Sequence, residues 1–228
     1  MARARGFAFL LLFVRSNPLF GQDVAQSDSA LVAELRAAAA VPMSAPFALA
    51  TDRCAQAAER GAVPILIEAL GRVRGVDAVA NQSRIGIARA LGQLGDPAAV
   101  PAVLGLLEDQ SGAQDLHVNR VAAEALGRLG DPRAAEPLAR ALFLTVRGES
   151  IQPAVRVALA GLGQAGVEPL ARILRNEDGV VRVRADRAML LPSLLSEIAA
   201  RALGDIGDPA AVPVLLEALR GDDPAVVA

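Results

Sequence analysis

A short motif recurs along this 228-residue chain and strongly limits what the chain can fold into. Its complete form reads Ala-Leu-Gly-x-Leu-Gly-Asp-Pro, with Ile at the fifth position of the last copy, and a degenerate copy without Asp-Pro lies at 161–169. A partial copy ends at 60–70. Self-similarity at a period of a few tens of residues is typical of stacked repeat proteins. Equivalent leucines, at spacings of 35, 36 and 41, are taken to be Leu91, Leu126, Leu162 and Leu203.

The residues before each Gly-Asp-Pro corner predict an amphipathic helix, and those after it predict a second helix. Gly130 is expected to end the first helix in a left-handed conformation. Pro132 suits the first turn of the next helix, while Pro137 predicts a slight irregularity just past that turn. A carboxylate before the proline can cap the second helix, so we interpret these acids as structural caps and not as catalytic groups. The caps are Asp96, Asp131 and Asp208.

A helix pair of this kind cannot bury its apolar face alone, so several pairs must stack. The chain is 53% hydrophobic but only 3% aromatic, which suits closely packed helices better than sheets. We therefore predict an all-α fold, a right-handed α-α superhelix of about five to six helix pairs. The array is expected to span 22–228, with clear repeats from about residue 80, degenerate copies over 28–75 with helices near 31–40 and 47–60, and a last repeat cut short at 221–228. Linkers are expected at 72–82, 108–118, 145–152 and 176–192.

Residues 1–21 have the pattern of a secretory signal peptide. Arg3 and Arg5 precede an apolar run of eight residues, Phe7 to Val14, which is too short to span a bilayer. We therefore expect an exported protein, periplasmic or extracellular, without a stable membrane span. A mis-assigned start codon or a disordered tail would explain the same residues, and the protein would then be cytoplasmic.

Charge and composition argue against several kinds of site. The formal net charge of −2 provides no basic surface for nucleic acid. Cys54 is the only cysteine and His117 the only histidine, so neither a thiolate metal cluster nor a Ser-His-Asp triad is expected. Gly161 to Gly166 fits GxGxxG, but a helix is expected before it where a dinucleotide site needs a strand. We predict no metal, no cofactor and no catalytic residues.

An arginine-rich stretch near the end of the array is the candidate binding site. Five guanidinium groups within sixteen residues could hold an anionic partner through forked hydrogen bonds. They lie where residues are inserted into the repeat, and such insertions often mark the binding face of a solenoid. The alternative is a solvated linker neutralised by Glu177, Asp178 and Asp186. The candidate partner-binding residues are Arg172, Arg175, Arg182, Arg184 and Arg187.

The repeated unit resembles the HEAT repeats of the bacterial phycobilin-lyase-like type, over roughly residues 50–228. The Leu-Gly-x-Leu-Gly-Asp-Pro core carries this resemblance. The resemblance implies a curved two-layer helix stack with the second helices lining the concave side. It also implies that most members bind proteins, that a minority assist chromophore attachment to phycobiliproteins, and that distant helical-repeat relatives act on DNA. The chain departs from the pattern at 163–169 and around 178–196.

We predict a non-enzymatic scaffold that binds an unidentified protein or peptide along the concave face or along the edge formed by the linkers. Stacked repeats create extended surfaces of this kind. A phycobilin-lyase-like role in chromophore attachment is the main alternative, and it rests on the resemblance alone. A DNA-binding or repair role is a third reading, which the net acidity and the absence of Trp and Tyr disfavour.

Overall fold

The computed structural model describes residues 29–109, 114–146 and 148–220. The predicted signal segment 1–21 and the predicted start of a further repeat at 221–228 lie outside the described residues. Among the residues that are described, no helix is long and apolar enough to cross a membrane.

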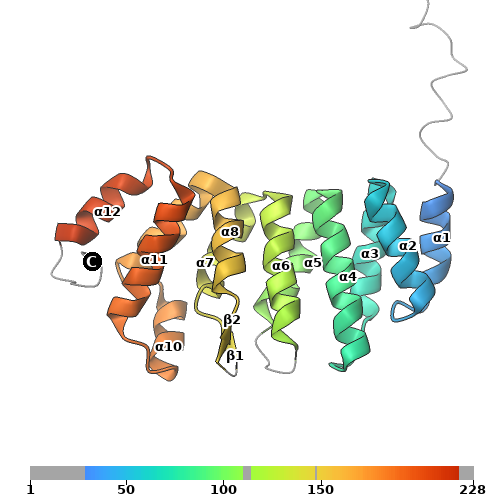
Figure 1. Cartoon of the computed structure of the whole chain (residues 1–228), viewed down its shortest axis with the longest axis horizontal. Helices are drawn as coiled ribbons and strands as arrows, with labels where there is room; N and C mark the ends of the chain where they lie inside the picture. Colours follow the sequence, from blue (N-terminus) through green and yellow to red (C-terminus); the bar gives the residue numbers. More distant parts are fainter. Residues whose placement is uncertain (1–28, 110–113, 147, 221–228) are drawn as a thin grey trace, which may run out of the picture.

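The described chain is an all-α stack of helix pairs in two layers (Figure 1). One layer holds the first helix of each pair, and each of these helices packs against the next along the stack. These helices are α2 (Ala45–Gln56), α4 (Ala78–Leu94), α6 (Leu116–Leu129), α8 (Gln152–Leu162) and α11 (Pro192–Ile206). The other layer holds α3 (Val63–Arg72), α5 (Val100–Glu108), α7 (Ala135–Ala141), α9 (Val167–Leu174) and α12 (Ala211–Arg220). A further helix, α1 (Ala30–Ala38), packs on α2 at one end.

The core lies between the two layers, and its leucines reveal the register of the repeats. Leu91, Leu126 and Leu203 are fully buried, as expected of equivalent positions. In the degenerate copy, Leu159 is fully buried and Leu162 is only half-buried. The predicted equivalence of Leu162 with the other three is therefore wrong: Ala-Leu-Ala-Gly-Leu-Gly at 158–163 matches Ala-Leu-Gly-Arg-Leu-Gly at 125–130. The shifted match arises because Gly163 and Gly166 have the same spacing as Gly127 and Gly130.

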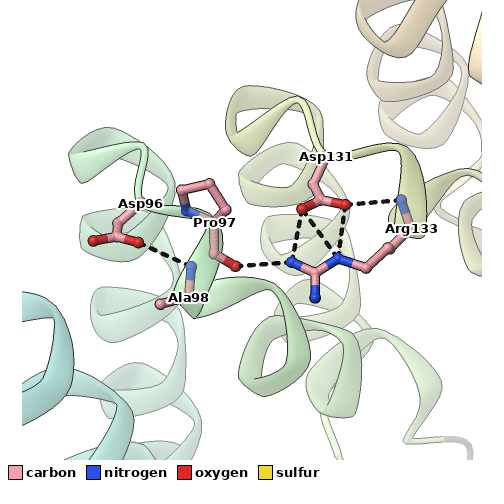
Figure 2. A network of polar contacts seen from close by, with 5 residues as sticks. All are labelled: Asp96, Pro97, Ala98, Asp131 and Arg133. Carbon is pink, nitrogen blue, oxygen red and sulfur yellow. Dashed lines mark hydrogen bonds and ion pairs between the residues drawn. The ribbon is translucent and has the colours of Figure 1, made fainter.

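Glycine and aspartate shape the corner within each regular pair. Gly130 has φ +65° and ψ +16°, the left-handed conformation predicted for it. Asp96 accepts a hydrogen bond from the Ala98 amide at 2.9 Å, and Asp131 accepts one from the Arg133 amide at 2.9 Å (Figure 2). Asp208 makes the same contact with the Ala210 amide at 2.8 Å.

Each of these corners begins with a tight turn before its second helix. Residues Pro97–Ala99 and Pro132–Ala134 form single 3₁₀ turns, η2 and η3, and the α-helix proper starts only at the next residue. The second proline, such as Pro137, therefore lies within the first turn of its α-helix. Amides there have no partner within the helix, so the ring breaks no hydrogen bond. The degenerate corner lacks the aspartate, and its 3₁₀ turn η4 (Gly163–Gly166) has no side-chain cap.

Small residues bring neighbouring helices of the first layer close together. A Cβ placed on Gly92 would lie 2.8 Å from the Ala125 Cα, and one on Gly127 would lie 2.8 Å from the Ala158 Cα. Real side-chain atoms do not approach backbone so closely, so these two positions require glycine. The repeated Ala-Leu-Gly thus sets the distance between α4, α6 and α8.

The expected linkers contain more structure than the sequence predicts. Two short strands, β1 (Thr145–Val146) and β2 (Glu149–Ser150), pair antiparallel within one of these linkers. The stretch 176–192 was expected to be a linker, but most of it is helix α10 (Gly179–Arg187). Asp178 caps this helix by accepting hydrogen bonds from the amides of Val180 and Val181. The insertion is therefore an additional short helix at the edge of the second layer.

Candidate functional site

The five predicted arginines do not converge on one point. Arg172 lies on α9 and forms an ion pair with Glu136 of α7 at 3.1 Å. Arg175 follows α9 and pairs with Glu217 of α12 at 3.0 Å. Both therefore connect neighbouring repeats across the second layer. The acids that neutralise them differ from those expected from the local sequence.

Arg140, which the sequence did not single out, links α7 to the inserted helix. Its guanidinium lies 2.6 Å from Glu136 and 2.9 Å from Asp178. Asp178 is buried. Burial alone would raise the pKa of this carboxyl, but hydrogen bonds from the Val181 amide and from Arg140 outweigh it and hold the pKa below its ordinary value. The only signal in the sequence was the Glu136–Arg140 spacing, which places the two on one helix face.

Arg184 lies on the inner side of α10 and donates a hydrogen bond to the Arg140 carbonyl oxygen at 3.4 Å. Partial burial, and then the nearby positive charge of Arg140, lower its pKa. Together with Glu108, Pro137 and Val180, the two arginines line a cleft of about 240 Å³ between α5, α7 and α10. Its charges are mixed, so it offers no concentrated anion site.

Arg182 and Arg187 are on the outer side of α10 and are exposed to solvent. Among the described residues, neither side chain has a hydrogen bond or an ion pair. Large apolar side chains are exposed beside them on the helix and in the turn that follows it. The α10 surface comprises Val180, Arg182, Val183, Arg187, Met189 and Leu191.

His117 and the GxGxxG stretch, both considered as sites from sequence, lie on different repeats of the described chain. His117 lies in the first turn of α6 and not in the linker before it, and its Nε2 is 2.9 Å from Arg120. Within the described ranges, no group of three or more His, Cys, Asp or Glu could hold a metal ion. The GxGxxG stretch consists of the last two residues of α8 and all of η4, so a helix stands where a dinucleotide site requires a strand.

Comparison with known families identifies the repeats. The model for HEAT repeats matches residues 80–156, and the model for the PBS lyase HEAT-like repeat matches residues 197–221. The chain contains HEAT repeats. The matched segments hold the complete Gly-Asp-Pro corners, whereas the shifted copy at 158–169 and α10 lie mostly outside them. The α10 surface is thus an addition to the HEAT pattern.

One solved structure supports the same fold. The chain is similar to the complex of CpcE and CpcF of phycocyanin lyase from Nostoc sp. PCC7120, with 24% identity, a TM-score of 0.51, and coverage of 89% of this HEAT-repeat chain and 73% of that chain. It is also similar to human deoxyhypusine hydroxylase in complex with glycerol, with 17% identity, a TM-score of 0.37 and coverage of 86% and 93%. A comparison with curated protein sequences found no significant match.

Proposed function

We propose that this HEAT-repeat chain is a binding scaffold that docks a partner protein on its α10 surface. The observation that carries the proposal is the exposure of apolar side chains there. Met189 is 90% exposed, Leu191 69% and Val183 49%. Large apolar side chains exposed close together in the sequence are candidates for an interaction site.

The composition of the α10 surface suits a protein partner. Arginine and methionine are both enriched in protein interfaces, where arginine can donate several hydrogen bonds and methionine adapts its shape. Arg182, Asp186 and Arg187 are all exposed on this helix, so arginines outnumber acids there. A matching partner surface would therefore be apolar, with carboxylates facing the two arginines.

The inserted helix is anchored at its start and along its inner side. Val181 and Ala185 are buried on its inner side, and Asp178 both caps the helix and pairs with Arg140. A surface ordered before binding loses less conformational entropy on association than a flexible loop does. The insertion thus gives the scaffold a preformed docking site at one edge of the array.

An affinity capture with charge-reversed protein tests the proposal. The full chain carrying Arg182→Glu and Arg187→Glu should lose the partner that the unmodified chain captures, as measured by quantitative mass spectrometry. A matched control carries Arg128→Glu and Arg220→Glu, which make the same change in net charge at exposed positions elsewhere. A partner retained by the first variant, or lost equally from both, would contradict docking on the α10 surface.

The apolar part of the surface needs its own variant. Met189→Ser should weaken capture, because the substitution removes an apolar contact with the partner. Met189 is exposed, so the fold should stay intact. Val157→Ser is the control, since Val157 is 74% exposed on α8, away from α10. Equal capture by Met189→Ser and unmodified protein would argue against an apolar contact at this site.

A second candidate is a role in chromophore attachment. It is favoured by the match to the PBS lyase HEAT-like repeat and by the likeness to the phycocyanin lyase complex. If the chain has this role, incubation with a linear tetrapyrrole should give a visible absorption band that co-elutes with the protein on gel filtration. Free pigment and colourless protein eluting separately would remove the support for this candidate.

A further inference from the structure

A cleft of about 280 Å³ lies between α2 and α4, at the opposite end of the stack from α10 (Figure 1). The two helices belong to the same layer and pack directly against each other. The repeats are degenerate here, and no motif in the sequence pointed to the cleft. Its lining includes both apolar groups and unpaired polar groups.

A buried hydroxyl lines this cleft without a hydrogen-bond partner. Thr51 is only 2% exposed, and its Oγ1 has no partner in the described part of the chain. A buried hydroxyl without a hydrogen bond destabilises the fold, so native structures nearly always provide a partner. A polar group of a ligand in the cleft would supply the missing hydrogen bond.

Opposite charges also line the cleft without pairing. Asp52 on α2 and Arg89 on α4 are both lining residues, and both are exposed. Neither has an ion pair or hydrogen bond among the described residues, including with each other. Elsewhere in the same layer such groups do pair, as Arg156 of α8 does with Asp205 of α11. A cleft with a separate carboxylate and guanidinium is complementary to a molecule that carries both an ammonium and a carboxylate.

The rest of the lining is apolar and leaves room for a side chain. Phe47 is buried and lines the cleft. Met43 and Val79 also line it, and their side chains are 40% and 55% exposed. Gly86 also lines the cleft, and a Cβ at that position would meet nothing within 4 Å. Small-molecule sites commonly have volumes of about 300–1,000 Å³, so this cleft suits only a small ligand.

We propose that the α2–α4 cleft binds a free amino acid with an apolar side chain. Asp52 would receive its ammonium, Arg89 its carboxylate, and Thr51 would hydrogen-bond to one of these polar groups. The apolar side chain would lie against Phe47 and Met43. This site is independent of the α10 surface, and it makes the chain a receptor for a small molecule as well as a scaffold.

Isothermal titration of the full chain with L-leucine, L-methionine and L-phenylalanine tests the proposal. At least one should bind saturably. N-acetyl-L-leucine lacks the ammonium and L-leucinamide lacks the carboxylate, so each should bind at least about tenfold more weakly than L-leucine if L-leucine is a ligand, which corresponds to ~1.4 kcal/mol. Absence of saturable binding by all three amino acids up to about 10 mM would overturn the proposal.

Variants then locate the binding. Gly86→Leu should fill the cleft and abolish binding, whereas Gly105→Leu is the control, because a Cβ on Gly105 in α5 also meets nothing within 4 Å. Retained binding in a folded Gly86→Leu chain, judged by circular dichroism, would place the ligand elsewhere and overturn the proposal. Should Gly86→Leu not fold, Asp52→Asn and Arg89→Gln change only exposed side chains. Each should weaken binding at least about tenfold, and unchanged affinity in both would overturn the assignment.

Discussion

Asp178 is the single residue on which the position of the inserted helix most depends. It accepts hydrogen bonds from two amides at the start of α10 and from the Arg140 guanidinium of α7. One carboxylate thus caps a helix and ties it to the array. Removing it would leave the cap and the ion pair unmade together.

We predict that Asp178→Ala lowers the free energy of unfolding by about 2–4 kcal/mol, because it removes a helix cap and leaves Arg140 without one partner. Asp178→Asn should cost less, since asparagine also caps helices. Urea denaturation followed by circular dichroism measures both. Equal stability of Asp178→Ala and the unmodified chain would contradict this role.

The same residue predicts a dependence on pH. The pKa of Asp178 in the folded chain lies below its ordinary value, so its charge stabilises the fold above an ordinary pKa of about 4. This contribution is lost as the pH falls through the folded-state pKa. The stability difference between the unmodified chain and Asp178→Asn should therefore be largest near neutral pH and shrink in acid. A stability difference that grows in acid would show that the charged form of Asp178 does not stabilise the fold.

The corner aspartates are expected to contribute unequally to the stability of the fold. Asp131 holds the Arg133 side chain, which donates in turn to the Pro97 carbonyl oxygen of the preceding corner at 3.3 Å (Figure 2). Asp96 makes only the capping contact with Ala98. Asp131→Ala should therefore lower the melting temperature more than Asp96→Ala does. A larger decrease for Asp96→Ala in differential scanning calorimetry would show that the contact from Arg133 to Pro97 adds nothing to stability.

At the scale of helices, the distance between α6 and α8 depends on Gly127. We predict that Gly127→Ala destabilises the chain by about 1–3 kcal/mol, since the new methyl group would overlap the α8 backbone at Ala158. The same substitution at Gly105 should stabilise by about 0.5–1 kcal/mol, because alanine favours helix and nothing lies in its way. Chemical denaturation of both variants checks the opposite signs. A stabilising Gly127→Ala would contradict the close approach.

The helices that could be predicted from sequence are those with a full apolar face and a Gly-Asp-Pro corner. Helix α10 escaped prediction because only Val181 and Ala185 are buried in it, which leaves no helical period to detect. Its capping aspartate, followed by Val180 and Val181, was the available signal. The register of α8 was assigned wrongly because Gly163 and Gly166 have the same spacing as Gly127 and Gly130. Burial of Leu159 and the positive φ of Gly163 identify the correct match.

The sequence singles out the insertion as a binding region, and that location stays a prediction. Arg172 and Arg175, two of its five arginines, are ion-paired with distant acids. Their partners lie on other repeats, at sequence separations that a single sequence does not reveal. The exposure of Met189 and Leu191 likewise follows from how α10 packs, which local sequence does not fix.

The whole molecule is a linear array in which each helix pair packs chiefly on its neighbours. Stability in such arrays is the sum of local terms, so the ends open more readily than the middle. Hydrogen exchange should be slowest in α4 and α6 and fastest in α1 and α12. Uniform protection across the array would indicate a single cooperative unit and contradict this expectation.

The proposal that the α10 surface docks a partner protein is tested most directly by hydrogen–deuterium exchange on the isolated complex. The account predicts that residues 179–191 gain protection on binding, while α4 exchanges as it does in the free chain. Unchanged exchange over 179–191, with protection gained only on other helices, would contradict it.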